Sequence, residues 1–397
     1  MNHAAESPAL LKPVDIDVDE VLEGLLEWVA IETPSSRPEQ ISKLLDIAER
    51  DIAGSPIERR RVPGRDGHGD HLVLTYNPAG SNAARALVMG HVDTVWPIGT
   101  LERRPIRTDG DRLYGPGIYD MKAGSYLAYH AIRLLGQCGA VPPRPVVVLL
   151  NSDEEIGSPT SRALIEELAA TAAFVLVPEP AVGPDTAAVT SRKGWGRFTM
   201  TAHGRPAHAG GNLAEGRSAI REIARQILDL EALTDLGTGT TVNVGVVSGG
   251  TLLNMVPAEA HIEIDLRVAD EEAGRRLTHA IVSRPPFDPD IRLEIEGGIN
   301  RPPFRRDFGV ERLFKAAAGL AGELGFDLPE TARGGVSDGN FSAALGRPTL
   351  DGLGCGGHGA HAEDEHIRVS TIAPRAALIY DMLVSIDFQN NAVGKTS

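Results

Sequence analysis

Apolar residues in the first half of the chain fall into two alternating kinds of segment. Runs of consecutive apolar residues, which are typical of buried strands, occur at 86–89, 145–150 and 173–177. Segments whose apolar residues recur every three or four positions predict helices at 21–30, 123–135 and 161–170. This alternation favours an α/β layer in which a largely parallel sheet is flanked by helices.

The pattern changes near residue 191. It now predicts a strand at 198–202, a helix at 215–233, strands at 241–247 and 258–268, a helix at 270–283 and a strand at 291–295. In the second of these central strands, Ile262, Ile264 and Leu266 alternate with charged residues, as expected of a strand with one buried face. We therefore expect an inserted α+β unit with its own core at 193–301.

The α/β pattern returns after the proline-containing run at 301–303. Helices are expected at 308–324 and 374–386, with a strand at 348–353 between them. A chain of 397 residues is also longer than one average domain. Residues 1–192 and 302–397 are thus expected to form one α/β domain that the insertion interrupts.

Composition and charge narrow the class of partner. The formal net charge is −15, which argues against nucleic acid and against an anionic membrane surface as main partners. The two cysteines, Cys138 and Cys355, provide neither a disulfide framework nor a cysteine-rich zinc site. No segment approaches the ~20 apolar residues that a membrane span needs, and the N-terminus lacks an apolar core of signal-peptide length. We therefore expect a soluble, cytoplasmic protein.

Residues with metal-binding chemistry follow several of the predicted strands. They are His91 and Asp93 after 86–89, Asp120 after the Gly-Pro-Gly turn at 115–117, Glu154 and Glu155 after 145–150, Glu179 after 173–177, and His361 after the glycine-rich segment 352–359. In an open α/β sheet, ligands gather outside the carboxyl ends of the strands. Two histidines and several carboxylates suit zinc, and the number of carboxylates favours two metals that share one of them.

Each of these residues also has an ordinary structural interpretation. A histidine after a strand, such as His91, is often structural or solvated. Asp120 fits the N-cap of a helix, and the pair Glu154 and Glu155 fits a solvated helix start. Glu179, between two prolines, fits a surface turn. These separate structural interpretations do not explain why all of the residues occur together, in this order and on these elements. Their joint occurrence therefore favours the metal-binding interpretation.

The motifs around these residues resemble those of one known family. They are His91-Val92-Asp93-Thr94-Val95, Gly115-Pro116-Gly117-Ile118-Tyr119-Asp120-Met121-Lys122, Asp153-Glu154-Glu155-Ile156-Gly157-Ser158, Pro178-Glu179-Pro180, Ala207-His208-Ala209-Gly210 and His361. From 22 to 386 the chain resembles the M20 family of zinc peptidases and amidohydrolases, above all its glutamate carboxypeptidase branch. The resemblance implies an α/β catalytic domain with a mixed central sheet flanked by helices, plus an inserted α+β lid and dimerisation domain.

The resemblance also implies a pair of zinc ions in each chain. Asp120 would bridge the two ions. His91 and Glu179 would complete one site, and Glu155 and His361 would complete the other. Cobalt or manganese in place of zinc is left open, because ligand geometry and metal supply decide which ion is bound.

Two further residues receive roles beside the metals. Glu154 would act as general base and acid, taking a proton from the metal-activated water and passing it to the leaving amine. Asp93 would hold the second ring nitrogen of His91 with its carboxylate and so fix the tautomer. His358 competes with His361 as a ligand, and the acidic stretch that follows His361, which is similar to that of family members, favours the latter.

His208 lies in the inserted unit, far from the metal ligands in the sequence. The resemblance implies that it reaches the active site of a partner subunit and contacts the reacting oxygen there. It thereby implies a homodimer that is built through the inserted domain and closes over the substrate. A histidine in a surface loop is the ordinary alternative for this position.

Several other residues resemble the family's substrate contacts. Arg267 would bind the α-carboxylate of the leaving amino acid, because arginine suits a bidentate grip. Asn254 would contact the substrate or the reacting oxygen. Gly334 and Gly335 would allow close approach of the chain to the substrate. Arg301 is a candidate for a side-chain carboxylate, and equally for a solvated hinge residue.

Three functions remain open at this point. The first is a di-zinc hydrolase that cleaves the amide bond between an acyl or peptidyl group and a C-terminal amino acid, with glutamate expected. The second is an N-acyl-amino-acid deacylase similar to acetylornithine deacetylase. Glutamate at position 179 resembles the carboxypeptidase and deacylase branches of the family, which the resemblance therefore favours over the aminopeptidase branch. The third, a non-catalytic binding protein on the same fold, is disfavoured by the complete set of ligands with Glu154.

Overall fold

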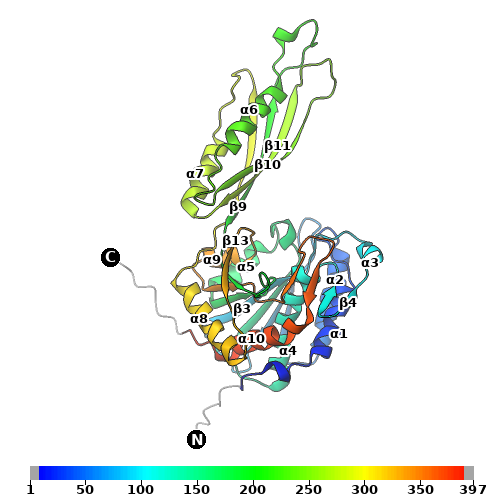
Figure 1. Cartoon of the computed structure of the whole chain (residues 1–397), viewed down its shortest axis with the longest axis vertical. Coiled ribbons are helices and arrows are strands. Elements are labelled where there is room, and N and C mark those ends of the chain that lie inside the picture. Colours follow the sequence, from blue (N-terminus) through cyan, green and yellow to red (C-terminus); the bar gives the residue numbers. More distant parts are fainter. Residues whose placement is uncertain (1–8, 389–397) are drawn as a thin grey trace, which may run out of the picture. The chain divides into compact units, whose positions relative to one another are not determined.

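The computed structural model describes residues 9–388, which form two compact units (Figure 1). The first unit takes the chain up to Ser191, then Arg305–Ala332, and then the residues from Ser337 onward. The second takes Arg192–Phe304 and Arg333–Val336. It is slightly wider than the insertion expected at 193–301. Within residues 9–388, no helix is long and apolar enough to cross a membrane.

The main sheet of the chain has eight strands. Their order is β1 (Glu58–Val62), β2 (His71–Tyr76), β6 (Val146–Asn151), β3 (Arg85–His91), β7 (Ala172–Val177), β14 (Thr349–Asp351), β8 (Ala188–Arg192) and β13 (Glu330–Arg333). Strand β3 is parallel to β6 and β7, and β14 is parallel to β7, whereas β2 is antiparallel to both β1 and β6. The mixed sheet that the family resemblance implied is confirmed. The largely parallel sheet that the apolar runs favoured holds for the central strands, but the prediction is wrong toward the edges, where the pairs are antiparallel.

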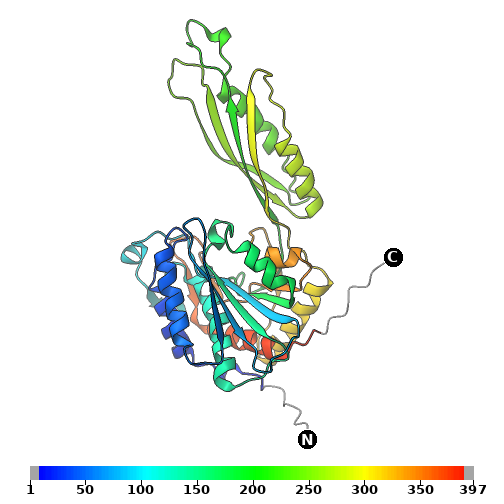
Figure 2. The same ribbon diagram turned by 180° about the vertical axis from the view of Figure 1, so that it is seen from behind.

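Helices cover both faces of this sheet (Figures 1 and 2). One face packs against α1 (Val18–Val29), α2 (Pro38–Asp51), α4 (Ala123–Cys138), α8 (Phe308–Glu323) and α10 (Ile372–Ser385). The other packs against α5 (Arg162–Ala170) and α9 (Gly339–Ala344). Because successive side chains of a strand point to opposite faces, Val88 and Val148 enter the first core, and Leu87 and Val147 enter the second.

A small antiparallel sheet lies elsewhere in the first unit. Its order is β15 (Gly357–His358), β16 (His366–Arg368), β5 (Arg112–Tyr114) and β4 (Arg107–Asp109), and the short helix α3 (Thr100–Arg103) precedes β4. The loop between β15 and β16 carries His361. That residue has a φ of 61°, in the left-handed region that side chains other than glycine seldom adopt. His361 thus lies in a turn whose main-chain conformation is unusual for a histidine.

The second unit is an antiparallel sheet with two helices on one face. The strand order is β10 (Thr241–Gly249), β11 (Glu259–Val268), β9 (Gly194–His203) and β12 (Arg292–Arg301), and the helices are α6 (Ala219–Glu231) and α7 (Glu271–Val282). The alternation in β11 is realised, since Ile262, Ile264 and Leu266 are buried in the core against these helices. Helix α6 begins four residues later than expected because the side chain of Ser218 caps it at that point.

Candidate metal centre

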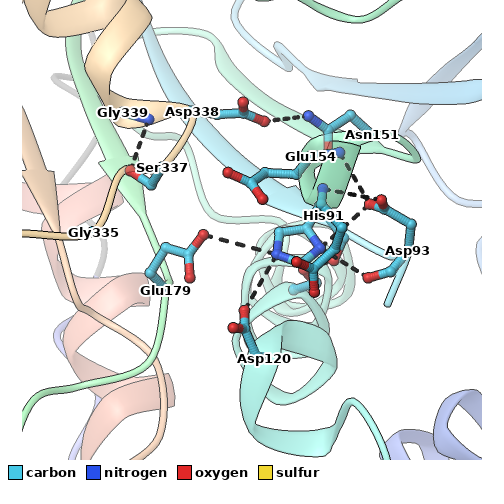
Figure 3. A network of polar contacts seen from close by, with 12 residues as sticks. His91, Asp93, Asp120, Asn151, Glu154, Glu179, Gly335, Ser337, Asp338 and Gly339 are labelled. Carbon is cyan, nitrogen blue, oxygen red and sulfur yellow. Dashed lines mark hydrogen bonds and ion pairs between the residues drawn. The ribbon is translucent and has the colours of Figure 1, made fainter. Parts of the chain in front are cut away.

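All five metal-ligand candidates lie in the first unit, and Figure 3 labels three of them, His91, Asp120 and Glu179. His91 is the last residue of β3, Asp120 lies in the helical turn η2 (Ile118–Lys122), Glu155 lies in the turn η3 (Glu154–Ile156) after β6, Glu179 follows β7 by two residues, and His361 lies between β15 and β16. Strands β6, β3 and β7 are parallel neighbours, so their carboxyl ends meet at one edge of the sheet. That edge brings together residues far apart in the sequence.

Asp120 lies between the two histidines and presents one carboxylate oxygen to each. Its Oδ1 is 3.4 Å from Nε2 of His91, and its Oδ2 is 3.3 Å from Nε2 of His361. Glu179 Oε1 is 3.8 Å from the same nitrogen of His91, and Glu155 Oε2 is 3.1 Å from that of His361. The five side chains thus form two groups of three that share Asp120.

The separations in each group suit a shared cation. In a tetrahedral zinc site with bonds of about 2.0–2.1 Å, neighbouring ligand atoms lie roughly 3.3 Å apart. Among the described residues, Nε2 of His91 and Oε1 of Glu155 are buried polar atoms without a hydrogen-bond partner. A buried polar atom without a partner is costly, and a metal ion would satisfy both. The residues therefore fit a pair of divalent metal ions.

The tautomer of His91 that its hydrogen bonding favours is also the one that suits a metal ion. Its Nδ1 lies 2.9 Å from the main-chain carbonyl oxygen of Asp93, a partner that can only accept a hydrogen bond. The proton of a neutral His91 therefore sits on Nδ1, and the lone pair of Nε2 points toward the carboxylates of Asp120 and Glu179. Three acceptor groups that face one another in this way suit a shared cation.

The carboxylates and imidazoles of the cluster shift one another's pKa values because they are close together and largely buried. Burial and the nearby charge of Asp120 raise the pKa of Glu179 well above its usual range. Burial would lower the pKa of His91, but contacts with Asp120 and Asp93 raise it well above the usual value. Contacts with Asp120 and Glu155 raise the pKa of His361 to about 10. Burial opposes ionisation of Asp120, yet the two imidazoles lower its pKa overall. The cluster thus favours positive charge at its centre.

Asp93 is fully buried and organises the site in a way that differs from the sequence-based expectation. The bond to His91 is made by its main-chain carbonyl, while its carboxylate Oδ1 lies 3.4 Å from the ring nitrogen. The carboxylate instead accepts hydrogen bonds from the main-chain N–H groups of Glu154 and Glu155, at 3.2 Å each, and from Ser35 Oγ at 2.7 Å. Asp93 therefore contacts His91 through its carbonyl group and also holds the main chain of Glu154 and Glu155.

Glu154 is half-buried, and its carboxylate lies on the side of the site where Glu179 lies (Figure 3). The loop beneath it is held by a buried network. Asp338 accepts hydrogen bonds from Ser158 Oγ at 2.6 Å and from the side-chain amide of Asn151. Asp153 accepts hydrogen bonds from the N–H and hydroxyl groups of the nearby 160–161 segment. These contacts give the Glu154 turn a defined position.

Glu365 is a polar residue of this region to which the sequence analysis gave no role. It is buried, and its carboxylate accepts hydrogen bonds from the main-chain N–H groups of Gly117, Tyr119 and Asp120 and from the indole of Trp96. Burial raises the pKa of Glu365 to about 7, although these donors counteract the rise. The only indication in the sequence is the acidic stretch after His361, and an acidic stretch does not show which of its carboxylates is buried.

Two other histidines near His361, the competitor His358 and also His366, lie apart from the metal-ligand groups. His358 is exposed, and its Nδ1 is 3.6 Å from Asp364 Oδ2. His366 is buried, its Nδ1 lies 2.7 Å from the main-chain oxygen of Asp364, and its ring packs against Tyr114. Within residues 9–388, neither belongs to a group that could hold a metal.

The remaining candidate residues lie in the second unit, and two of them share one end of it. His208 lies in an exposed loop that pairs with Met255, and the N–H of Ala209 donates to the carbonyl of Asn254 at 3.0 Å. Nδ1 of His208 accepts hydrogen bonds from the N–H groups of Gly210 and the next residue, at 3.1 Å each. Its proton is therefore on Nε2 when the ring is neutral, so this nitrogen is a donor directed away from its own loop.

The two arginines lie at the other end of the same sheet. Arg267 on β11 and Arg301 on β12 are both register partners of Trp195. The guanidinium of Arg267 makes two hydrogen bonds, of 2.9 and 3.0 Å, with the carboxylate of Asp265. Arg301 is almost fully buried and donates to Asn300 Oδ1 at 2.9 Å. Arg267 is thus already engaged with an acid of its own strand.

Gly334 and Gly335 are exposed, and a Cβ atom at either position would meet open space. Their main chain does not adopt the left-handed conformation that would demand glycine. The small size of these residues is therefore not required by neighbours within the chain. Their proposed closeness to a substrate stays a prediction.

Comparison with known proteins places these features in a family. Residues 87–385 match the sequence model of the peptidase family M20/M25/M40. Carboxypeptidase G2 from Pseudomonas sp. (strain RS-16) is 30% identical, over 91% of this chain and 89% of the relative. Acetylornithine deacetylase from Myxococcus xanthus is also 30% identical, over 77% of this chain and 84% of the relative.

A solved structure gives the same result for the fold. The crystal structure of aminopeptidase PepT from Bacillus cereus is similar with a TM-score of 0.74, covering 93% of this chain and 98% of that one. The two sequences are 23% identical, so this similarity speaks for the fold alone. Together, the sequence and structure comparisons confirm the resemblance that the motifs indicated.

Proposed function

Because the chain belongs to the peptidase family M20/M25/M40, an amide-hydrolysing family of metallopeptidases and amidohydrolases, we propose a specific form of this chemistry for it. The chain cleaves the amide bond between an acyl or peptidyl group and a C-terminal amino acid, glutamate in the first instance, with two zinc ions held around Asp120. The observation that carries the proposal is the bridging position of Asp120, with one oxygen facing each imidazole. Cobalt or manganese would fit the same nitrogen and oxygen ligands.

Glu154 performs the proton transfers in this proposal. When bound, the zinc pair lowers the pKa of a water molecule and polarises the substrate carbonyl. Glu154 accepts the proton of the attacking water on its carboxylate and then donates it to the nitrogen of the leaving amine. Asp93 keeps Glu154 in place through the main-chain hydrogen bond at 3.2 Å.

His208 supplies the hydrogen bond to the reacting oxygen from a second copy of the chain. In β11, Arg267 pairs with Trp195 and Glu259 pairs with His203, so these residues mark opposite ends of the sheet. A rise of about 3.3 Å per residue places the two ends roughly 26 Å apart. A small substrate held by the arginines cannot also touch His208 of the same chain, which lies beyond the Glu259 end. The same argument assigns Asn254 to the partner site with His208.

The second unit has a surface suited to such a homodimer. Strand β10 lies at the edge of its sheet, and Val246 and Val247 on it are exposed. The following loop exposes Leu252 and Leu253, the latter completely. An exposed edge strand with apolar side chains is a template for pairing with another chain. A second copy related by two-fold symmetry would cover this edge and bring His208 into the partner's site.

Arg267 and Arg301 take the carboxylates of the substrate. Glutamate offers two of them, and arginine binds each through a planar pair of hydrogen bonds. Binding requires Arg267 to exchange its bond with Asp265 for one with the substrate. The open space at Gly334 and Gly335 leaves room for the chain to approach the amino acid.

A second candidate function is N-acyl-amino-acid deacylation. The acetylornithine deacetylase of Myxococcus xanthus has the same 30% identity to this chain as the carboxypeptidase, over 77% of the chain instead of 91%. The same metal centre would serve both reactions, and the two differ in which side of the amide bond is selected. A non-catalytic binding protein is disfavoured by the complete ligand set with Glu154. A cytoplasmic location stays a prediction.

The experiment that tests the proposal is hydrolysis of a panel of N-acyl amino acids. The acyl group and the amino acid are varied separately, and kcat/KM is measured for the zinc-loaded chain. We expect glutamate to be preferred across different acyl groups. A preference for one acyl group across different amino acids would favour the deacylase, and no hydrolysis of any member would overturn both proposals.

A further inference from the structure

The main chain that carries the bridging ligand is held by one buried acid. Glu365 Oε1 accepts hydrogen bonds from the N–H groups of Tyr119 and Asp120, at 2.9 and 3.0 Å. Its Oε2 accepts hydrogen bonds from the N–H of Gly117 at 2.8 Å and from Nε1 of Trp96 at 2.6 Å. Each oxygen therefore receives two donors, which only an ionised carboxylate can satisfy fully.

The far end of the same turn has its own anchor. Nζ of the buried Lys122 donates to the main-chain oxygens of Trp28 and Ile31, at 3.1 and 2.5 Å. The segment from Gly117 to Lys122 is thus fixed at both ends, and Asp120 lies between the two anchors. Of the two, Glu365 is the one that bonds directly to the main chain of Asp120.

We propose that Glu365 is a positioning residue for both metal sites at once. It touches neither ion, because its two oxygens are occupied by the four N–H donors. It sets the direction of the Asp120 side chain by holding the N–H of that residue and of its neighbour Tyr119. Since Asp120 is the one side chain shared by the two ligand groups, displacement of this turn disturbs both groups together.

This role distinguishes Glu365 from the ligands. Loss of His91 or His361 removes a nitrogen from one group and leaves the other group complete. Loss of Glu365 leaves every ligand atom present, but it removes the hydrogen bonds that hold Asp120, the ligand common to both groups. The inference rests on the proposed two-metal function, and it adds a residue that lies outside the ligand set.

The test is a zinc titration, with a chromophoric chelator as competitor, of the full chain and its Glu365→Gln variant. Glutamine keeps the size of the side chain but turns an NH2 group toward two N–H donors. We expect the affinity for both zinc equivalents to fall by roughly 10–100-fold, as is typical when a group supporting metal ligands is lost. Saturating zinc should restore most of kcat, because Glu365 has no part in the proton transfers.

Two further variants support the interpretation. Glu363→Gln makes the same chemical change at an exposed site in the same segment, and it should bind zinc as the wild type does. Glu365→Asp keeps the charge but is one methylene shorter, and it should give a smaller loss at both equivalents. If Glu365→Gln does not fold by circular dichroism, the Glu365→Asp titration decides.

The outcomes separate this inference from the proposed function. A wild-type chain that binds fewer than two zinc ions would overturn the two-metal function itself. A wild-type chain that binds two, together with folded Glu365 variants that bind both with unchanged affinity, would overturn the inference alone. So would a loss confined to one equivalent, because it would show that Glu365 does not act through the shared ligand.

Discussion

The candidate groups of the two units are held in opposite ways. In the first unit, His91 and Asp93 are almost fully buried, and the main chain of the Glu154 turn donates hydrogen bonds to the Asp93 carboxylate. In the second unit, His208 is exposed and is held mainly by the main chain of its own loop. Buried side chains whose positions are set by packing and by supporting hydrogen bonds are suited to metal binding, because little rearrangement is needed when the ion binds. An exposed donor on an edge is instead suited to a surface that another chain provides.

The largest expected effect comes from the ligand that both groups share. Asp120→Asn removes the bridging charge, so we expect both zinc ions to be lost and hydrolysis to fall to the uncatalysed background. Metal analysis after dialysis and a hydrolysis assay measure the two effects. Asp185→Asn, an exposed change of the same kind, is the control and should behave as wild type. Full zinc content in Asp120→Asn would show that the two groups do not share this carboxylate.

The next effect separates chemistry from metal binding within the first unit. Glu154→Gln should keep two zinc ions and lose roughly 10²–10⁴-fold in kcat, the range expected for a general acid–base group. Metal content and steady-state kinetics on the same preparation test this. A variant that turns over at the wild-type rate would remove Glu154 from the base role, and one that loses zinc would make it a ligand.

A smaller effect tests the exposed donor of the second unit. His208→Ala should lower kcat by roughly 10²–10³-fold, as loss of one donor to a reacting oxygen does. In a two-fold dimer, mixing His208→Ala with Glu154→Gln chains creates one intact site in each mixed dimer.

Random mixing of equal amounts should therefore restore about one quarter of the wild-type activity. Each variant alone, refolded or exchanged in the same way, is the control. Absence of recovery in dimers shown to be mixed would mean that His208 acts in its own chain or not at all.

The smallest expected effect concerns Arg267, which the structure shows bonded to Asp265. Arg267→Lys should raise KM for an acyl-glutamate by roughly tenfold, because a bidentate grip is lost, and should change kcat little. An unchanged KM with a lower melting temperature would instead assign Arg267 to the stability of its own sheet.

Much of the fold could be predicted because buried strands in this chain are uninterrupted apolar runs. Strands β3, β6 and β7 were expected within one to two residues, and they carry or precede three of the ligands. Strand β1 reads Glu58-Arg59-Arg60-Arg61-Val62 and was missed, since its pairing with β2 depends on main-chain bonds at the sheet edge. Strands β2 and β8 are antiparallel to their neighbours β6 and β14, and periodicity along the sequence does not indicate the direction of a strand in its sheet.

The site could be predicted where a side chain itself performs the chemistry. His91, Asp120 and Glu179 have side chains that can bind a metal, and their residue types and places in the sequence point to metal binding. Glu365 and the carboxylate of Asp93 act by accepting bonds from main-chain N–H groups. Every residue except proline has a main-chain N–H group, so the sequence does not indicate which N–H groups a buried carboxylate will bind. These contacts become visible only when the chain is folded.

The most direct test of the account is the zinc content of the wild-type chain. Equilibrium dialysis against buffered zinc, followed by elemental analysis and protein quantification, gives the number of ions in each chain. The bridging geometry of Asp120 predicts two, with hydrolysis of acyl-amino acids rising as the sites fill. One zinc ion or fewer at saturation would contradict the account.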